Sequence, residues 1–110
     1  MQGTPAPNDA LAELVSLLSE EETRDLVRLY LRDFPQTMEA LARGPAKDHQ
    51  RLAHSMKSSS QYMGAAELSE RFRQLELRLG TPGEKVTPAD LQGIAAEFSK
   101  VETALRAFVG

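Results

Sequence analysis

One histidine, His54, lies in a stretch that favours a helix and faces away from the side that must be buried. The stretch covers residues 45–63 and is flanked by glycines on both sides. Its predicted buried stripe comprises Leu52, Met56, Ser59 and Met63. At about 100° of rotation per residue, His54 lies roughly 200° round from Leu52, nearly opposite this stripe. A solvent-exposed imidazole can attack a phosphoryl group without a dedicated base, since histidine has an unperturbed pKa of about 6.5.

Polar side chains share the exposed face with His54. Lys57 lies one turn further on and about 60° round, where its ammonium could offset negative charge on phosphoryl oxygens. The candidates for partner contact are Lys47, Gln50, Ser58 and Gln61. For Ser58 we favour a steric role, because bulk there would block the approach to His54. For Gln61, phosphate or partner binding and a plain solvated surface role both stay open.

The sequence lacks the residue patterns that a metal site, a hydrolase or a kinase would need. His49 precedes His54 by five residues, about 140° round the helix, so the two do not face one ion and no metal site is expected. We expect His49 to pack at the edge of the buried stripe. No Asp or Glu falls one turn from His54 to orient it, which disfavours a hydrolase. A kinase is excluded because the chain has no glycine-rich phosphate loop and no paired metal-binding acids.

The sequence from His54 onward resembles the signature of histidine-containing phosphotransfer (HPt) domains. The resemblance rests on residues 54–68, HSMKSSSQYMGAAEL, and continues to Leu75 and Glu76. The family pattern is a His, a Leu or Met, a Lys, usually a Gly, two small residues, an apolar residue, Gly-Ala and a Leu. Ser58 stands where the family usually has glycine, but serine is still small, so the approach to the imidazole stays open on one side.

The resemblance implies a helical bundle that carries a phosphoryl group on Nε2 of His54. It implies that the group comes from an aspartyl phosphate of one receiver domain and passes to another. The partners would be receiver domains of response regulators or of a hybrid sensor histidine kinase. No cofactor is expected on this chain, since Mg²⁺ belongs to the receiver. The alternative is a non-catalytic interaction or dimerisation module with an unused His54, for which Leu77 and Val109 are the candidate exposed apolar residues.

Length and composition fit one small helical domain. A chain of 110 residues forms a single domain, and few aromatic residues with many Leu and Ala favour helices. The net charge of −3 gives no support to a nucleic-acid partner. The chain has no Cys, no apolar run long enough to span a bilayer and no signal-peptide pattern. We therefore expect a cytoplasmic monomer.

The periodicity predicts an all-α, antiparallel up-down four-helix bundle with a short additional N-terminal helix. Residues 1–7 are expected to form a disordered lead-in and residues 8–110 the domain. The predicted segments are a short helix after Asn8, a long helix from Ser19 to Gly44, the His54 helix, a helix ending at Gly80 and a last helix capped by Thr87. The predicted buried side of the long helix comprises Leu26, Tyr30, Phe34, Met38 and Leu41. Pro35 predicts a kink or a local break in it.

Overall fold

The computed structural model describes residues 4–110, and within that range it contains helices and no strand. The elements in chain order are α1 (Asp9–Leu17), α2 (Glu20–Arg43), the short 3-10 turn η1 (Ala46–Asp48), α3 (His49–Tyr62), α4 (Ala66–Leu79) and α5 (Pro88–Val109). The predicted all-α class is confirmed. None of the helices within this range combines the length and apolar character needed to cross a membrane.

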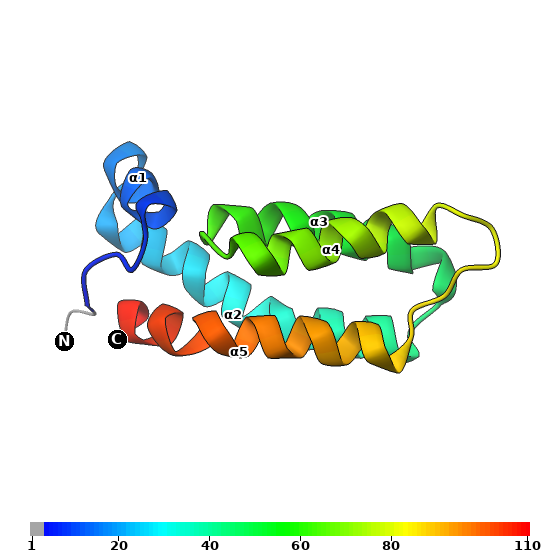
Figure 1. Ribbon diagram of the computed structural model, residues 1–110. Coiled ribbons are helices and arrows are strands. Elements are labelled where there is room, and N and C mark those ends of the chain that lie inside the picture. The colour runs from blue at the N-terminus through cyan, green and yellow to red at the C-terminus, as the bar shows by residue number, and fades with distance from the viewer. Residues whose placement is uncertain (1–3) are drawn as a thin grey trace.

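Four helices, α2 to α5, lie along the long axis of the molecule, and each reverses the direction of the one before it (Figure 1). Contacts link α2 to α3, α3 to α4, α4 to α5, and α5 back to α2, so the four helices close into a bundle. The short α1 packs across one end against α2 and α3. The bundle measures 47 × 21 × 20 Å.

The two longest helices begin at residues whose side chains cap them. Ser19 Oγ accepts a hydrogen bond from the N–H of Glu22 at 3.0 Å at the start of α2. At the start of α5, Thr87 and Asp90 bond to each other's backbone N–H groups, and Pro88 occupies the first turn. Such caps satisfy N–H groups that have no partner inside the helix. Both predicted starts are therefore confirmed.

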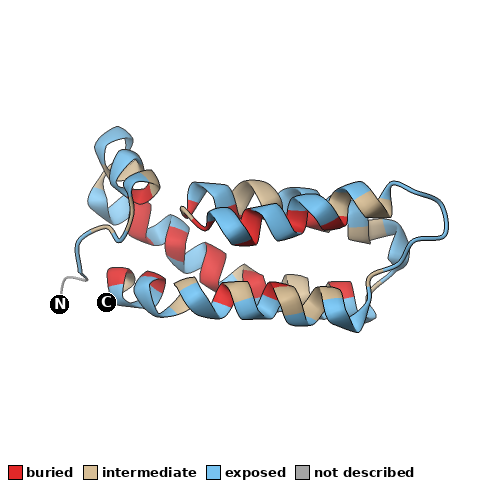
Figure 2. Ribbon diagram, viewed as in Figure 1, coloured by how far each residue is buried: buried red, intermediate tan, exposed pale blue. Residues whose placement is uncertain are grey.

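The core lies between the inward faces of the helices, where the buried residues form stripes (Figure 2). Phe34 of α2 stacks on Phe98 of α5, with ring centroids 3.8 Å apart and an interplanar angle of 8°. Phe72 of α4 is fully buried and meets Phe34 edge-on at 6.3 Å. These rings join three of the four long helices through apolar contact, the main favourable term in folding.

The buried side of α2 differs slightly from the one that the sequence pattern predicts. Leu26 is 40% exposed, whereas its neighbour Val27 is fully buried. Leu26 instead faces the space between α1, α2 and α3, where it lines a groove. Of the kink or local break predicted at Pro35, the break does not occur, since α2 is one continuous helix from Glu20 to Arg43. Pro35 is exposed, and the buried Phe34 beside it holds this part of α2 in the core.

The buried side of α3 also differs from the prediction. Leu52 and Ser59 are only partly buried, whereas Ala53 and Ser60 are fully buried. Small residues on that side let another helix approach closely, and α3 makes its most extensive packing with α4. The buried Ser60 hydroxyl is satisfied by the Tyr30 hydroxyl at 2.8 Å. The prediction from the sequence pattern therefore placed the buried stripe of α3 part of a turn away from its position in the structure.

The chain before α1 lies against the bundle where the structure describes it. The N–H of Thr4 donates to the carbonyl of Ala107 at 3.1 Å, and Ala6 packs against the core. Residues 1–3 of the predicted lead-in lie outside the described residues. Asn8 Oδ1 accepts from the N–H of Leu11 at 2.9 Å and so caps α1 as predicted.

Candidate functional site

The side chain of His54 lies on the outer face of α3, as its position in the sequence predicts. It is 59% exposed, while Met56 two residues later is buried. The helical rotation of about 200° between these two positions accounts for the difference. The imidazole is therefore open to an approaching protein surface.

A carboxylate from the neighbouring helix holds one nitrogen of the ring. Glu76 of α4 lies with Oε2 at 2.6 Å from Nδ1 of His54. Its other oxygen, Oε1, lies 3.0 Å from Nζ of Lys57. The Glu76 side chain is only 20% exposed, so these two contacts satisfy a carboxylate that has limited access to water. His54, Glu76 and Lys57 thus form one connected cluster across α3 and α4.

The contact with Glu76 distinguishes the two ring nitrogens of His54. An ionised carboxylate can only accept hydrogen bonds, so the nitrogen facing it must carry the proton. This assigns the proton of the neutral ring to Nδ1, the tautomer that its partner requires. Nε2 then carries the free lone pair on the exposed imidazole. The ring is therefore set up to act as a nucleophile through Nε2.

Glu76 remains ionised because of the same two neighbours. Its limited exposure alone would raise the pKa of the carboxyl group. The hydrogen bonds from Lys57 and His54, together with their charges, outweigh that effect and bring the pKa of Glu76 below its ordinary value. An ionised Glu76 can balance positive charge on either neighbour.

Close contact between α3 and α4 brings Glu76 within reach. The hydroxyl of Ser69 on α4 donates to the carbonyl of Lys57 on α3 at 2.8 Å. Further along, the side-chain amide of Gln50 donates to the carbonyl of Glu76 at 3.3 Å. One contact lies on each side of the His54–Glu76 pair along the helices. The relative position of the two helices is therefore fixed on both sides of the site.

The turn between α3 and α4 sets how the two helices meet. Gly64 has a φ of 79°, in the left-handed region that favours glycine. A Cβ at this position would come within 2.4 Å of the Asn8 side chain, so a larger residue would also clash. Asn8 Nδ2 donates to the carbonyl of Met63 at 2.9 Å just before the turn. Asn8, the residue that caps α1, thus also stabilises the end of α3.

The predicted partner-contact residues fall into three places. Gln50 lies beside the cluster through its bond to Glu76. Ser58 and Gln61 line a shallow hollow together with Tyr62. Lys47 is exposed in η1, before α3 begins, and lines a separate hollow between η1 and the residues before α5. The structure therefore places Gln50, Ser58 and Gln61 along the His54 face and Lys47 at the far end of it.

His49 has the structural position that the sequence predicts. Its Nε2 lies 3.0 Å from the carbonyl of Ala40 and 3.1 Å from that of Gly44. Ala40 lies in the last turn of α2, where its carbonyl also accepts the N–H of Gly44 at 2.8 Å, and Gly44 is the residue that ends the helix. His49 therefore stabilises the end of α2 and is not part of the His54 cluster.

Glu76 is the residue of the site that sequence reasoning missed. The search for a carboxylate one turn from His54 covered only its own helix, where there is none. Glu76 follows His54 by 22 residues and reaches it from α4. The one available signal was its position at the end of the resembling segment. Among residues 4–110 the structure shows no group of acidic, His or Cys side chains that could hold a metal ion.

Comparison with known families agrees with the helical fold. The family model of the Hpt domain matches residues 25–106, which is most of the chain. The chain therefore belongs to the Hpt domain family, whose members are histidine phosphotransfer modules of two-component phosphorelays. No match was found among curated proteins or among solved structures.

Proposed function

We propose that this chain is a phosphorelay intermediate that takes a phosphoryl group on His54 from the aspartyl phosphate of one receiver domain and passes it to another receiver. The observation that supports this most is the pairing of His54 Nδ1 with Glu76 at 2.6 Å, on an imidazole that is 59% exposed. The pairing leaves Nε2 as the free nucleophile. Such a histidine needs no additional base on this chain.

In the proposed step the lone pair of Nε2 attacks the phosphorus in line with the departing aspartate oxygen. A P–N bond forms as the P–O bond breaks, and the bonding electrons leave on the aspartate carboxylate. The ring keeps its Nδ1 proton and becomes positively charged. Glu76 lies against that proton and balances the new charge. The reverse sequence of events delivers the group to the next aspartate.

Lys57 is proposed to stabilise the transferring phosphoryl group. Its Nζ lies on the same carboxylate as the His54 ring, which places a positive charge beside the reaction centre. The Lys57 side chain is 27% exposed and retains access to the outer face. We expect Mg²⁺ to be supplied by the receiver domain, and we expect no ATP-dependent kinase activity from this chain.

For the alternative, a non-catalytic interaction or dimerisation module, the sequence singled out Leu77 and Val109. Leu77 of α4 is 63% exposed, as expected for a residue that another protein could cover. Val109 is instead partly buried against the core. A single exposed leucine is common on protein surfaces and does not by itself mark an interface. The phosphotransfer role is therefore the stronger proposal.

The test is phosphate transfer from a phosphorylated receiver, with two matched histidine variants. Wild type should acquire phosphate that is labile in acid and stable in base. His54→Gln should acquire none and keep its helical circular dichroism spectrum, because the lost side chain is exposed. His49→Gln should still accept phosphate, although we expect it to unfold more easily by about 1 kcal/mol. Labelling of His49 in place of His54 would refute the proposal.

A further inference from the structure

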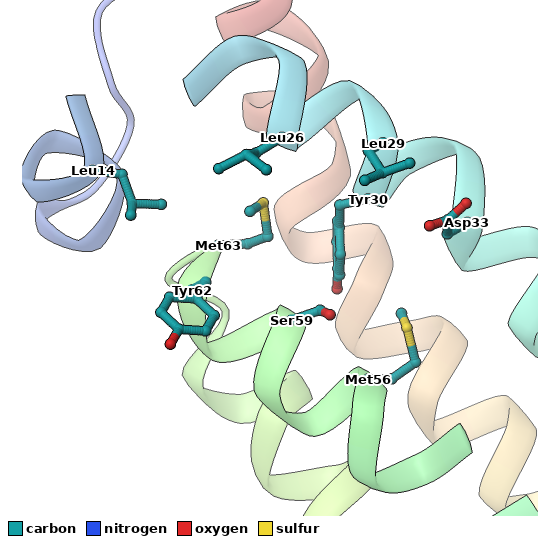
Figure 3. A pocket seen from close by; sticks show the side chains of 9 residues that line it. All are labelled: Leu14, Leu26, Leu29, Tyr30, Asp33, Met56, Ser59, Tyr62 and Met63. Carbon is teal, nitrogen blue, oxygen red and sulfur yellow. The ribbon is translucent and has the colours of Figure 1, made fainter. Parts of the chain in front are cut away.

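A groove on the surface of the bundle lies between α1, α2 and α3. It has a volume of about 330 Å³, and its lining residues are Leu14, Leu26, Leu29, Tyr30, Asp33, Met56, Ser59, Tyr62 and Met63. Figure 3 shows Leu14 at one end of the groove and Asp33 at the other. Leu26, Leu29 and Tyr62 are 40%, 42% and 64% exposed. Three large apolar side chains exposed around one groove indicate an interaction surface more strongly than a single one does.

The groove adjoins the His54 face of α3. Tyr62 lines both the groove and the shallow hollow that contains Ser58 and Gln61. Relative to His54, Ser58 lies about 40° round the helix and Tyr62 about 80° in the same direction. Lys57 lies about 60° round in the opposite direction, toward Glu76. His54 therefore stands between the charged cluster on one side and the apolar groove on the other, and Arg51, Ser55 and Ser58 lie on the groove side of it.

Asp33 lies at the end of the groove that is level with His54 along the axis of α3, although Met56, the α3 residue at that end, faces nearly the opposite side of the helix from His54. Met56, which lines the groove beside it, is two residues from His54, or about 3 Å along the axis of α3. Among the described residues that line the groove, Asp33 is the only charged one. The ion pair that the structure records for it joins it to Arg32, at 3.3 Å. Both side chains of that pair are exposed, so the pair is weak and leaves the carboxylate open to a partner.

We infer that Asp33 determines which receiver domains dock on this chain, by requiring a lysine or arginine beside the apolar surface that fills the groove. The inference rests on the proposed phosphotransfer function. A partner that reaches His54 from the groove side covers Asp33, and covering a carboxylate without a cation leaves an unpaired charge. A receiver with an apolar helical face and a suitably placed basic residue fits this surface, and one with an acidic residue there is rejected.

The experiment measures transfer from His54 to a panel of purified receiver domains encoded in the same genome. Each chain is first loaded on His54 with phosphoramidate, so that loading does not depend on any receiver. Transfer rates are then compared at receiver concentrations well below saturation, where docking limits the rate. The variants are Asp33→Lys, the milder Asp33→Asn, and Asp25→Lys as the matched control. Asp25 is also on α2, is exposed and pairs with an arginine, but it does not line the groove.

With the best receiver, Asp33→Lys should lower the transfer rate by about tenfold or more and Asp33→Asn by less. Asp25→Lys should stay within about twofold of wild type. Added salt should slow the wild type more than Asp33→Asn, because one attractive charge pair is already lost in the variant. Changing the facing basic residue of the receiver to glutamate should restore transfer from Asp33→Lys.

Two failures would be distinguishable. Equal transfer by wild type and Asp33→Lys, or equal loss in Asp33→Lys and Asp25→Lys, would overturn the role of Asp33 and leave the phosphotransfer function in place. Absence of transfer from loaded wild type to every receiver would overturn the proposed function and the role of Asp33 with it. Thermal unfolding followed by circular dichroism confirms that each variant is folded before its rate is compared.

Discussion

Glu76 and His54 come from neighbouring helices, and the carboxylate of the first lies 2.6 Å from Nδ1 of the second. Because the second oxygen of Glu76 binds Lys57, one side chain orients the ring and holds the nearby cation. The two nitrogens of His54 therefore have different environments, one against an anion and one toward solvent.

Replacing Glu76 should slow phosphate acceptance, and the loss should be larger when both its charge and its hydrogen-bond acceptor are removed. Glu76→Gln keeps an oxygen that can accept from Nδ1 but loses the charge, whereas Glu76→Ala loses both. We expect rates in the order wild type, Gln, Ala, with Ala slower by roughly ten- to a hundredfold, or about 1–3 kcal/mol. The measurement is loading by phosphoramidate, which needs no receiver. Glu70→Ala is the control, because Glu70 is also on α4 and binds Arg73 instead of His54. A wild-type rate in Glu76→Ala would contradict the orienting role.

The Glu76 contacts should stabilise the fold only while the carboxylate is ionised. The folded state lowers the pKa of Glu76 below the ordinary value of 4.5, so its stabilising contribution is present above that value. The contribution is lost as the pH falls through the lower pKa of the folded state. Urea unfolding of wild type and Glu76→Gln should therefore show a larger difference in the free energy of unfolding at about pH 5 than at about pH 3. A difference that grows on acidification through this range would contradict the assignment.

Lys57→Ala should slow transfer without abolishing it. One charge-stabilising contact, in a site shared with the receiver and its Mg²⁺, contributes on the order of 1–3 kcal/mol, or roughly ten- to a hundredfold in rate. The single-turnover rate from a phosphorylated receiver measures this effect. An unchanged rate would mean that Lys57 serves only to hold Glu76, with which it is paired at 3.0 Å.

Ser58 is the position where the chain departs from the usual family pattern, and two replacements should have opposite effects. Ser58→Gly should reduce the free energy of unfolding by up to about 1 kcal/mol, the usual cost of glycine inside a helix. Its transfer rate should equal or exceed that of wild type. Ser58→Leu should keep the fold and obstruct transfer, because Ser58 lies between His54 and the groove. Full transfer by Ser58→Leu would show that receivers do not dock over this side of α3.

The sequence predicted the helices and the exposed histidine because both depend on local information. Periodicity and capping residues such as Ser19 and Thr87 determine where a helix begins and which side it exposes. The partner of His54 could not be predicted in this way. Glu76 is 22 positions away in the sequence, and its contact with His54 depends on how closely α3 and α4 pack. Ala53 and Ser60 are fully buried in α3, but their small size meant that the search for large apolar residues did not select them.

The error at Leu26 has a similar origin. A leucine at helical spacing predicts burial when only its own helix is considered. Whether it is covered depends on the neighbouring helices, and α1 and α3 leave a groove at this position. Leu26 is 40% exposed for this reason, and the same gap contains the carboxylate of Asp33. The apolar pattern therefore predicted a core residue where the molecule has an exposed apolar groove.

The placement of His54 within α3 also affects how firmly a phosphoryl group would be held. The residue lies more than one turn from either end of the helix, where every backbone N–H is already bonded within the helix. Proteins that bind phosphate tightly often use the free N–H groups of a helix N-terminus, which are out of reach here. A phosphoryl group on Nε2 would thus be held by its P–N bond without free backbone N–H groups of this helix to bind its oxygens. Weak holding of this kind suits a carrier protein, which must release the phosphoryl group to the next protein as readily as it accepted the group from the last one.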